Sequence, residues 1–201
     1  LAEARAALAD EVRKSQTLAR VTQAVASSGD VDSCVQAVID GAREIIGAAY
    51  GAFFYNAVGA DGESYTLYRL SGAPPEAFEN FPMPRKTEVF APTFDGVGVV
   101  RSDDITQDPR YGRNAPRRGM PPGHLPVRSY LAIPVTTPQG AVLGGLFFGD
   151  PEPGRFTVRD EALLVGLGAQ VAVTIESIRI NAAALDELDQ RLTDTGYEVH
   201  Q

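Results

Sequence analysis

The sequence predicts an α+β domain, in which helices flank a central antiparallel sheet of about five or six strands. Long helices are expected at both ends of the chain, because apolar residues recur there every three or four positions. Between these ends, short apolar segments are joined in pairs by turn residues, as in antiparallel hairpins. Consecutive hairpins between helices are typical of a layered α+β fold.

Two helices are expected in the first 46 residues. An amphipathic stripe runs from residue 1 to about 28, and Ser27–Asp30 supplies residues that end a helix. A second stripe covers about residues 31–46. Either Asp30 or Asp32 can cap its start, and Gly47 can end it.

Two hairpins are expected. Residues 49–58 and 64–71 form the first, with turn residues between Asn56 and Gly62. Residues 130–135 and 141–149 form the second, with Pro138-Gln139-Gly140 as its turn. This turn lies inside a stretch without charges that is long enough to cross a bilayer, so we expect two strands there and no membrane insertion.

The segment between the hairpins has weaker patterns. Pro74-Pro75 can open a short helix, because proline is tolerated in a first turn. Residues 82–97 are expected to be irregular, residues 97–101 to form a strand, and residues 102–126 to form a long loop rich in proline and arginine.

The last helix is expected to begin near residue 158 and to continue to about residue 192. Thr157 stands at the N-cap position, with Asp160 three residues on, close to a capping box. A stripe of this length exceeds a typical globular helix and suggests one that is shared with a partner.

Composition excludes several classes of protein. The 201 residues suit one domain, and 18 Lys and Arg against 26 Asp and Glu leave a formal net charge of −8. We expect no nucleic-acid partner, because such proteins need excess basic residues to neutralise phosphates. The acids are unevenly placed, since residues 109–149 contain none of them. The same segment contains five arginines: Arg110, Arg113, Arg117, Arg118 and Arg128.

Reactive side chains are few. Cys34 is the only cysteine, which rules out an internal disulfide and a zinc site of several thiolates. No ligands are spaced for a metal, no cofactor is expected, and no nucleophile stands beside a base, so no catalytic residue is predicted. No secretory signal is visible near Leu1, and we expect a cytoplasmic protein.

Four stretches resemble a known family. They are Asp108–Gly112, Gly123–Val135, Val142–Gly149, and Phe156 followed by Asp160-Glu161. Together with the order of elements, they resemble a GAF domain, a PAS-related small-molecule sensor module, over residues 30–176. The chain looks most like the GAF domains of bacterial sensor histidine kinases. The resemblance implies a signalling and dimerisation helix over 1–29, a sensory domain over 30–176, and a linker helix with a tail over 177–201.

Three departures from the family pattern argue against particular ligands or activities that other members have. Gly149-Asp150 stands where some members have Asn-Lys, which argues against cyclic-nucleotide binding of the phosphodiesterase type. Gly123 precedes His124 where bilin-binding members have cysteine, so no covalent chromophore is expected there. Members that reduce free methionine sulfoxide need several cysteines, and this chain has one.

Several residues of the loop are candidates for ligand binding. Arginine forks bind carboxylates and phosphates, so a nucleotide, a tetrapyrrole propionate or a carboxylate metabolite would suit them. Each residue type also has an alternative role. The arginines could neutralise the acidic rest of the chain, and the histidine could form a hydrogen bond to loop backbone. The tyrosines could pack in the core, and the aspartate could cap a turn. The candidate residues are His124, Arg128, Tyr111, Tyr130, Arg113 and Asp104.

The terminal helices predict a homodimer, although they could instead cover only their own sheet. We expect a non-catalytic sensory and dimerisation module of a bacterial two-component protein, which relays ligand or upstream signals to an output kinase. The alternative is a small-molecule receptor domain for an anionic, nucleotide or non-covalent tetrapyrrole ligand. The expected dimer residues are Leu8, Val12, Leu18, Val21, Ile178, Leu185, Leu188 and Leu192.

Overall fold

Helices form at the start of the chain, as its apolar period predicts. The computed structural model describes residues 2–59, 62–74, 87–113 and 118–194. Helix α1 covers Ala2–Ala26 and α2 covers Val31–Ile46. Asp30 caps α2, because its carboxylate accepts a hydrogen bond from the N–H three residues on, at 2.8 Å. Gly47 ends α2 in the left-handed conformation, with a φ of 64°.

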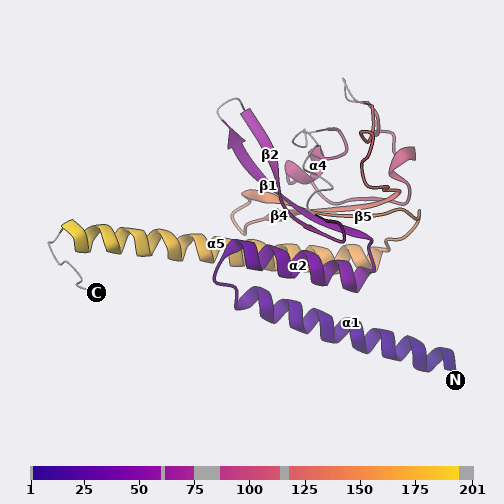
Figure 1. The fold of residues 1–201 in the computed structure, drawn as a ribbon, viewed down its shortest axis with the longest axis horizontal. Helices are drawn as coiled ribbons and strands as arrows, with labels where there is room; N and C mark the ends of the chain where they lie inside the picture. The colour runs from indigo at the N-terminus through magenta and orange to yellow at the C-terminus, as the bar shows by residue number, and fades with distance from the viewer. Residues whose placement is uncertain (1, 60–61, 75–86, 114–117, 195–201) are drawn as a thin grey trace.

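Five strands form one antiparallel sheet, which confirms the expected fold class. The order across the sheet is β2-β1-β5-β4-β3, and every neighbouring pair is antiparallel (Figure 1). The hairpins β1–β2 and β4–β5 meet at the centre, where Ala52 of β1 is opposite Phe147 of β5. The strands are β1 (Tyr50–Gly59), β2 (Gly62–Ser71), β3 (Val100–Ser102), β4 (Ser129–Thr136) and β5 (Val142–Asp150).

Some boundaries differ from the expected ones. The first hairpin is longer than expected, because β1 continues to Gly59 through residues that were expected to turn. Helix α4 (Ala91–Phe94) interrupts the segment expected to be irregular, where Pro92 suits a first turn and the Phe94 ring is buried. A 3₁₀ turn, η1 (Ile105–Gln107), lies in the long loop. The short helix expected from Pro75 onward lies outside the described residues.

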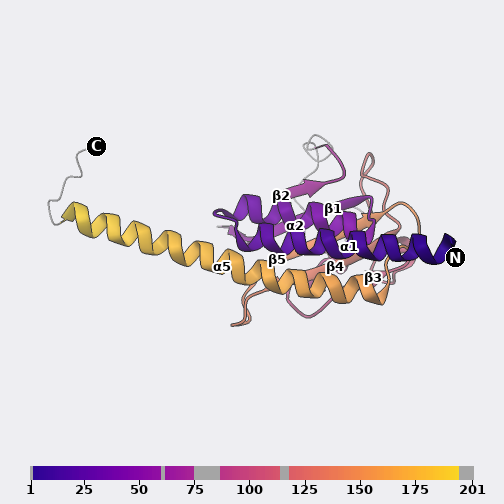
Figure 2. The ribbon, with the colours of Figure 1, turned by 90° about the horizontal axis from the view of Figure 1, so that it is seen from below.

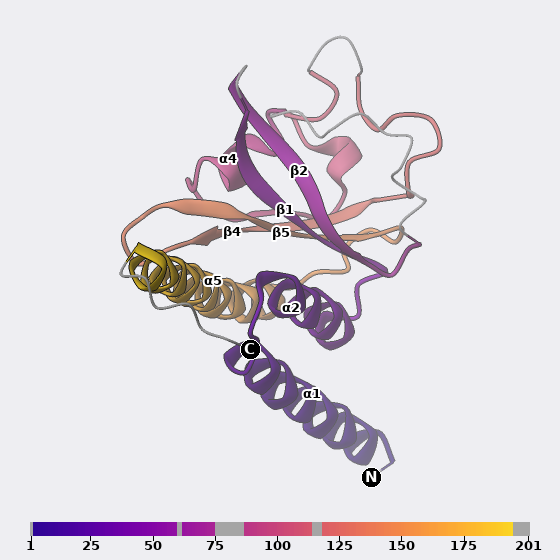
Figure 3. The same cartoon turned by 60° about the vertical axis from the view of Figure 1, so that its left-hand side comes forward.

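The helices and the loops cover opposite faces of the sheet. Helices α2 and α5 pack on one face, and α1 lies outside them (Figures 1 and 3). Helix α4 and the loop segments lie over the other face. The N-terminal end of α1 and the C-terminal end of α5 point to opposite ends of the molecule, because the two helices run in the same direction (Figure 2).

Helix α5 (Val158–Asp194) extends for 37 residues and leaves the sheet about halfway along its length (Figure 1). The predicted capping box forms at its start. The Thr157 hydroxyl accepts from the Asp160 N–H at 3.3 Å, and the Asp160 carboxylate accepts from the Thr157 N–H at 2.8 Å. Among the described residues, α5 is long enough and apolar enough to cross a bilayer. Its first half, however, buries Leu164 and Ile175 in the domain core.

Two apolar clusters occupy the two faces of the sheet, because side chains alternate along a strand. On β4, Leu131 and Ile133 join the core beneath α2 and α5. The intervening Tyr130 and Ala132 point to the opposite face and pack with Phe147 beneath the loops. The loop-covered face is where the structure contains a cavity.

Candidate functional site

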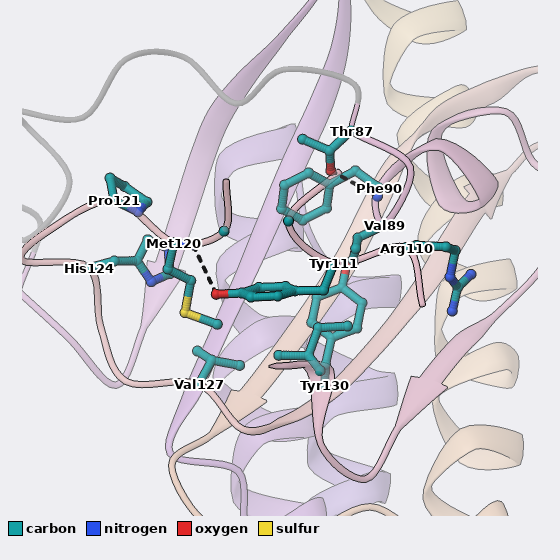
Figure 4. A pocket seen from close by; sticks show the side chains of 13 residues that line it. Thr87, Val89, Phe90, Arg110, Tyr111, Met120, Pro121, His124, Val127 and Tyr130 are labelled. Atoms are coloured by element: carbon teal, nitrogen blue, oxygen red, sulfur yellow. Dashed lines mark hydrogen bonds between the residues drawn. The ribbon is translucent and has the colours of Figure 1, made fainter. Parts of the chain in front are cut away.

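A cavity of about 180 Å³ lies between the loop face of the sheet and the loop segments (Figure 4). Its walls come from residues 87–90, from η1 and residues 110–112, from residues 119–127, and from the start of β4. The lining is mainly apolar and aromatic, as in most small-molecule sites. Three of the six predicted ligand-binding residues line it: His124, Tyr111 and Tyr130.

Tyr130 enters the cavity from the start of β4. Its side chain is 7% exposed, and its ring packs with Phe90 and Phe147 at centroid distances of 6.3 Å each. The hydroxyl oxygen is buried and has no hydrogen-bond partner among the described residues. Burial raises the pKa of Tyr130 well above its usual value, so the hydroxyl keeps its proton. Buried polar groups of this kind are usually hydrogen-bonded, so the Tyr130 hydroxyl is an available donor at the cavity.

Tyr111 holds one wall of the cavity in place. Its hydroxyl accepts a hydrogen bond from the Met120 backbone N–H at 3.0 Å, and Figure 4 shows the Tyr111 side chain reaching toward Met120. This bond links residues 110–112 to residues 119–127. Gly119 makes this approach possible, because a Cβ there would lie 2.7 Å from the Tyr111 oxygen. Gly119 also has a φ of 92°, which disfavours other residues.

Arg110 brings a positive charge to the cavity, and Asp108 balances it. The Arg110 Nε and Nη2 donate to the two carboxylate oxygens of Asp108 at 2.8 and 2.7 Å. These hydrogen bonds lower the pKa of Asp108 and raise that of Arg110. The pair therefore remains ionised and contributes little net charge to the site.

For His124, the sequence offers a place at the cavity and a hydrogen bond to loop backbone as alternatives, and the structure shows both placements, while ligand binding stays a prediction. His124 lines the cavity, and its Nδ1 lies 2.7 Å from the Leu125 carbonyl oxygen. Because a carbonyl only accepts, Nδ1 is the nitrogen that carries a proton in this contact. The bond fixes the orientation of the ring within the loop.

Arg128 and Asp104 lie outside the cavity lining and bind each other. The Arg128 Nε donates to Asp104 Oδ1 at 2.9 Å, and its Nη2 contacts the other carboxylate oxygen. Asp104 also accepts from the N–H and hydroxyl of Thr106, at 3.1 and 2.7 Å, and so caps η1. Hydrogen bonds from Arg128 and then Thr106 hold the pKa of Asp104 well below its usual range. The structure thus places these two residues in an ion pair outside the cavity lining, and ligand contact by either of them stays a prediction.

The remaining candidate arginine also lies apart from the cavity lining. Arg113 is exposed and does not line the cavity. Conversely, sequence reasoning missed several lining residues, because neither an isolated apolar side chain outside regular secondary structure nor one arginine among five has a spacing that marks it as cavity lining. These missed residues include Val89, Phe90, Ile105, Arg110, Met120 and Val127.

The predicted dimer residues differ in how exposed they are. Leu8, Val12, Leu185 and Leu188 are 48–66% exposed, so they are available to a partner. Leu18 and Ile178 are half-buried against the core of their own chain. Val21 corrects the prediction, because it is 3% exposed and packs on Gly41 of α2, where no partner reaches it. The side chain of Leu192 lies outside the described ones.

Comparison with known proteins supports one family. A sequence model described as the GAF domain matches residues 28–176. A curated relative, a cyclic di-GMP phosphodiesterase of Pseudomonas aeruginosa, is 34% identical over 97 residues, which are 48% of this chain. The match spans only 16% of that relative's length.

Solved structures show the same fold at low identity. The GAF domain of a phosphoenolpyruvate-protein phosphotransferase from Coxiella burnetii has a TM-score of 0.69 and 20% identity, covering 85% of this chain and 96% of its own. Free methionine-R-sulfoxide reductase from Neisseria meningitidis has a TM-score of 0.64 and 17% identity, covering 84% and 91%. The GAF domain of a candidate sensor histidine kinase from Pseudomonas syringae pv. tomato has a TM-score of 0.59 and 12% identity, covering 92% and 99%.

The family match covers most of the chain, and the five-stranded sheet and its flanking helices agree with the fold of the solved GAF domains. The chain therefore belongs to the GAF domain family.

Proposed function

We propose that this GAF domain is a non-catalytic sensory and dimerisation module of a bacterial signalling protein. In this role the chain forms a homodimer through α1 and α5, and α5 relays a ligand-dependent or upstream signal to an output domain. The single observation that carries the proposal is the second half of α5, which extends past the sheet with its leucines exposed.

Exposed apolar residues on α5 favour a partner helix. Ile180, Leu185 and Leu188 are 62%, 66% and 54% exposed. An isolated helical extension of this length is marginal in water, because helices depend on a packed apolar face. Leu8 and Val12 on α1 add a second exposed apolar surface, at 65% and 48%. Burying both surfaces against a second copy would stabilise the helices and remove apolar surface from water.

Strand β4 offers a route from the cavity to α5. Tyr130 contributes to the cavity, whereas the next residue, Leu131, lies in the core with Leu164 of α5. A ligand that moves Tyr130 would therefore move the strand on which α5 packs. Such a ligand shifts the balance between two packings only if it binds one of them more tightly.

The position of Cys34 supports a non-catalytic role. Although two structural neighbours are free methionine-R-sulfoxide reductases, Cys34 is the only cysteine and belongs to the core on the helix side of the sheet. Burial raises the pKa of its thiol to about 11, which disfavours the reactive thiolate. The cavity lies on the opposite face.

The output domain is proposed to be a histidine kinase, in a two-component pathway of the cytoplasm. The fold shared with a candidate sensor histidine kinase supports this choice. The local similarity to a cyclic di-GMP phosphodiesterase favours that enzyme as the second candidate output. In both cases the chemistry belongs to a domain other than this one.

Light scattering tests the dimer. We expect the chain to elute as a dimer at high micromolar concentration, and the Leu185→Glu, Leu188→Glu double variant to elute as a monomer with its helices intact by circular dichroism. Val97→Glu is the control, because Val97 is an apolar residue that is 79% exposed and lies between α4 and β3 in the chain, outside both α1 and α5. A wild-type monomer with intact helices would contradict the proposal.

A further inference from the structure

We propose that the cavity binds a neutral compound with a single aromatic ring and one hydrogen-bond acceptor, such as a ring-attached carbonyl, placed against the Tyr130 hydroxyl. This inference rests on the proposed sensory function, because it takes the cavity to be the sensing site. It replaces the nucleotide, tetrapyrrole or carboxylate ligand that the arginine-rich loop suggests from sequence.

The size of the cavity sets the number of rings. Its volume of about 180 Å³ is close to that of a cavity of roughly 150 Å³ that binds benzene. Pockets for drug-sized ligands have volumes of about 300–1,000 Å³. A single substituted ring fits this space, whereas a nucleotide or a tetrapyrrole exceeds it.

The walls favour an aromatic ring. Phe90, Tyr111 and Tyr130 contribute three rings from three separate segments (Figure 4). Aromatic rings attract one another in offset or edge-to-face geometries beyond the effect of buried area. The apolar side chains of Met120 and Val127 close the opposite side, and a thioether also packs well against a ring.

The charges around the cavity favour a neutral ligand. Arg110 is the arginine that lines the described cavity, and Asp108 already occupies its fork at two positions. The Asp108 side chain is only 9% exposed, so its charge is poorly screened by water. An anionic ligand would have to share Arg110 with this carboxylate and would meet its repulsion.

Tyr130 determines where the acceptor lies. Its hydroxyl is buried, protonated and without a partner among the described residues, so it has a proton to donate. A buried donor is stabilised by an acceptor and penalised without one. A carbonyl attached to the ring supplies an acceptor while the ring fills the apolar part of the cavity.

Four probes distinguish the ligand classes: acetophenone, ethylbenzene, benzoate and cyclic GMP. Two-dimensional ¹H–¹⁵N NMR titrations of the full chain would report binding through the amides of Met120 and Val127. Acetophenone and ethylbenzene have nearly the same shape and differ in the carbonyl. We expect acetophenone to bind more tightly than ethylbenzene, by about 3- to 10-fold for one hydrogen bond, and more tightly than the two anions.

The variant Tyr130→Phe removes the hydroxyl and retains the ring. We expect it to reduce the ratio of the acetophenone affinity to the ethylbenzene affinity to about one, while the affinity for ethylbenzene stays unchanged. Tyr50→Phe is the control, because Tyr50 begins β1 and does not line the cavity. If Tyr130→Phe is unstable, the ratio of the acetophenone and ethylbenzene affinities of the wild-type chain still tests whether the ligand carbonyl contributes to binding.

Three results would overturn the inference, and they separate it from the proposed function. Tighter binding of benzoate or cyclic GMP would refute the neutral class and leave the sensing cavity in place. Equal binding of acetophenone and ethylbenzene would refute the role of Tyr130. If none of the four probes moves the amides, both the inference and the cavity as a sensing site fail, while the dimer is tested separately.

Discussion

The Tyr111 hydroxyl accepts the Met120 backbone N–H at 3.0 Å, and this bond joins two loop segments that form opposite parts of the cavity wall. Both residues lie in a region without regular secondary structure, so few other backbone bonds hold it. The bond is therefore a sensitive place to test whether the cavity is rigid.

Tyr111→Phe removes this acceptor and retains the ring. We expect a loss of about 0.5–1.5 kcal/mol in the free energy of unfolding, the net contribution of one hydrogen bond. Urea denaturation measures this loss, with Tyr50→Phe as the control. Amide exchange should also accelerate at Met120, because its N–H loses its partner. Unchanged exchange at Met120 would show that other contacts hold the loop.

Much of the fold follows from local patterns in the sequence. The short uncharged apolar segments on either side of Pro138–Gly140 predict the β4–β5 hairpin, and Asp30 and Gly47 bracket α2 as capping chemistry predicts. Helix α4 has no such signal, because four residues are too few to show a period. It forms where Phe94 is buried beneath the sheet, which is a tertiary contact.

The candidate site was harder to predict, because it depends on which loop side chains meet. The segment 109–149 has five arginines and no acids, yet two of these arginines pair with carboxylates just before it. Arg110 binds Asp108, and Arg128 binds Asp104. Counting charge along the sequence suggests an anion site, whereas the folded loop neutralises these two charges locally. Only three-dimensional contacts distinguish the two outcomes.

The Asp104–Arg128 pair predicts a pH dependence of stability. The folded pKa of Asp104 lies below its ordinary value of 3.8, so the pair stabilises the fold fully above that value. This stabilisation declines as the pH falls below 3.8 toward the folded pKa. We expect Asp104→Asn to lower stability at pH 7, and the difference from wild type to shrink in acid.

Urea denaturation across the acidic range measures the effect of Asp104→Asn. The control is Asp103→Asn, since the Asp103 side chain is 74% exposed and exposed substitutions usually change stability by under about 0.5 kcal/mol. A difference between wild type and Asp104→Asn that stays constant down to the lowest pH would contradict the assigned role of the ion pair.

The contact between Val21 and Gly41 predicts how α1 is anchored. A Cβ at Gly41 would lie 1.9 Å from Val21 Cγ2, so Gly41→Ala forces α1 and α2 apart. We expect a loss of about 1–3 kcal/mol in the free energy of unfolding, typical of overpacking. Gly29→Ala is the control, because a Cβ there meets nothing within 4 Å. Equal stability of the two variants would mean that α1 moves freely on α2.

A single cysteine placed on α5 tests the orientation of the proposed dimer. If two copies of α5 pack in parallel, equivalent residues face each other, and Leu188→Cys should form an intermolecular disulfide on mild oxidation.

Cross-linking through the native cysteine should be rare, because Cys34 is buried and its pKa is raised to about 11. Val97→Cys provides the control, because Val97 is also exposed, at 79%, and lies between α4 and β3 in the chain, outside both α1 and α5. Non-reducing gel electrophoresis would show a dimer band for Leu188→Cys alone. If a dimer of wild-type mass forms but Leu188→Cys fails to cross-link, the helices pack antiparallel or through another face.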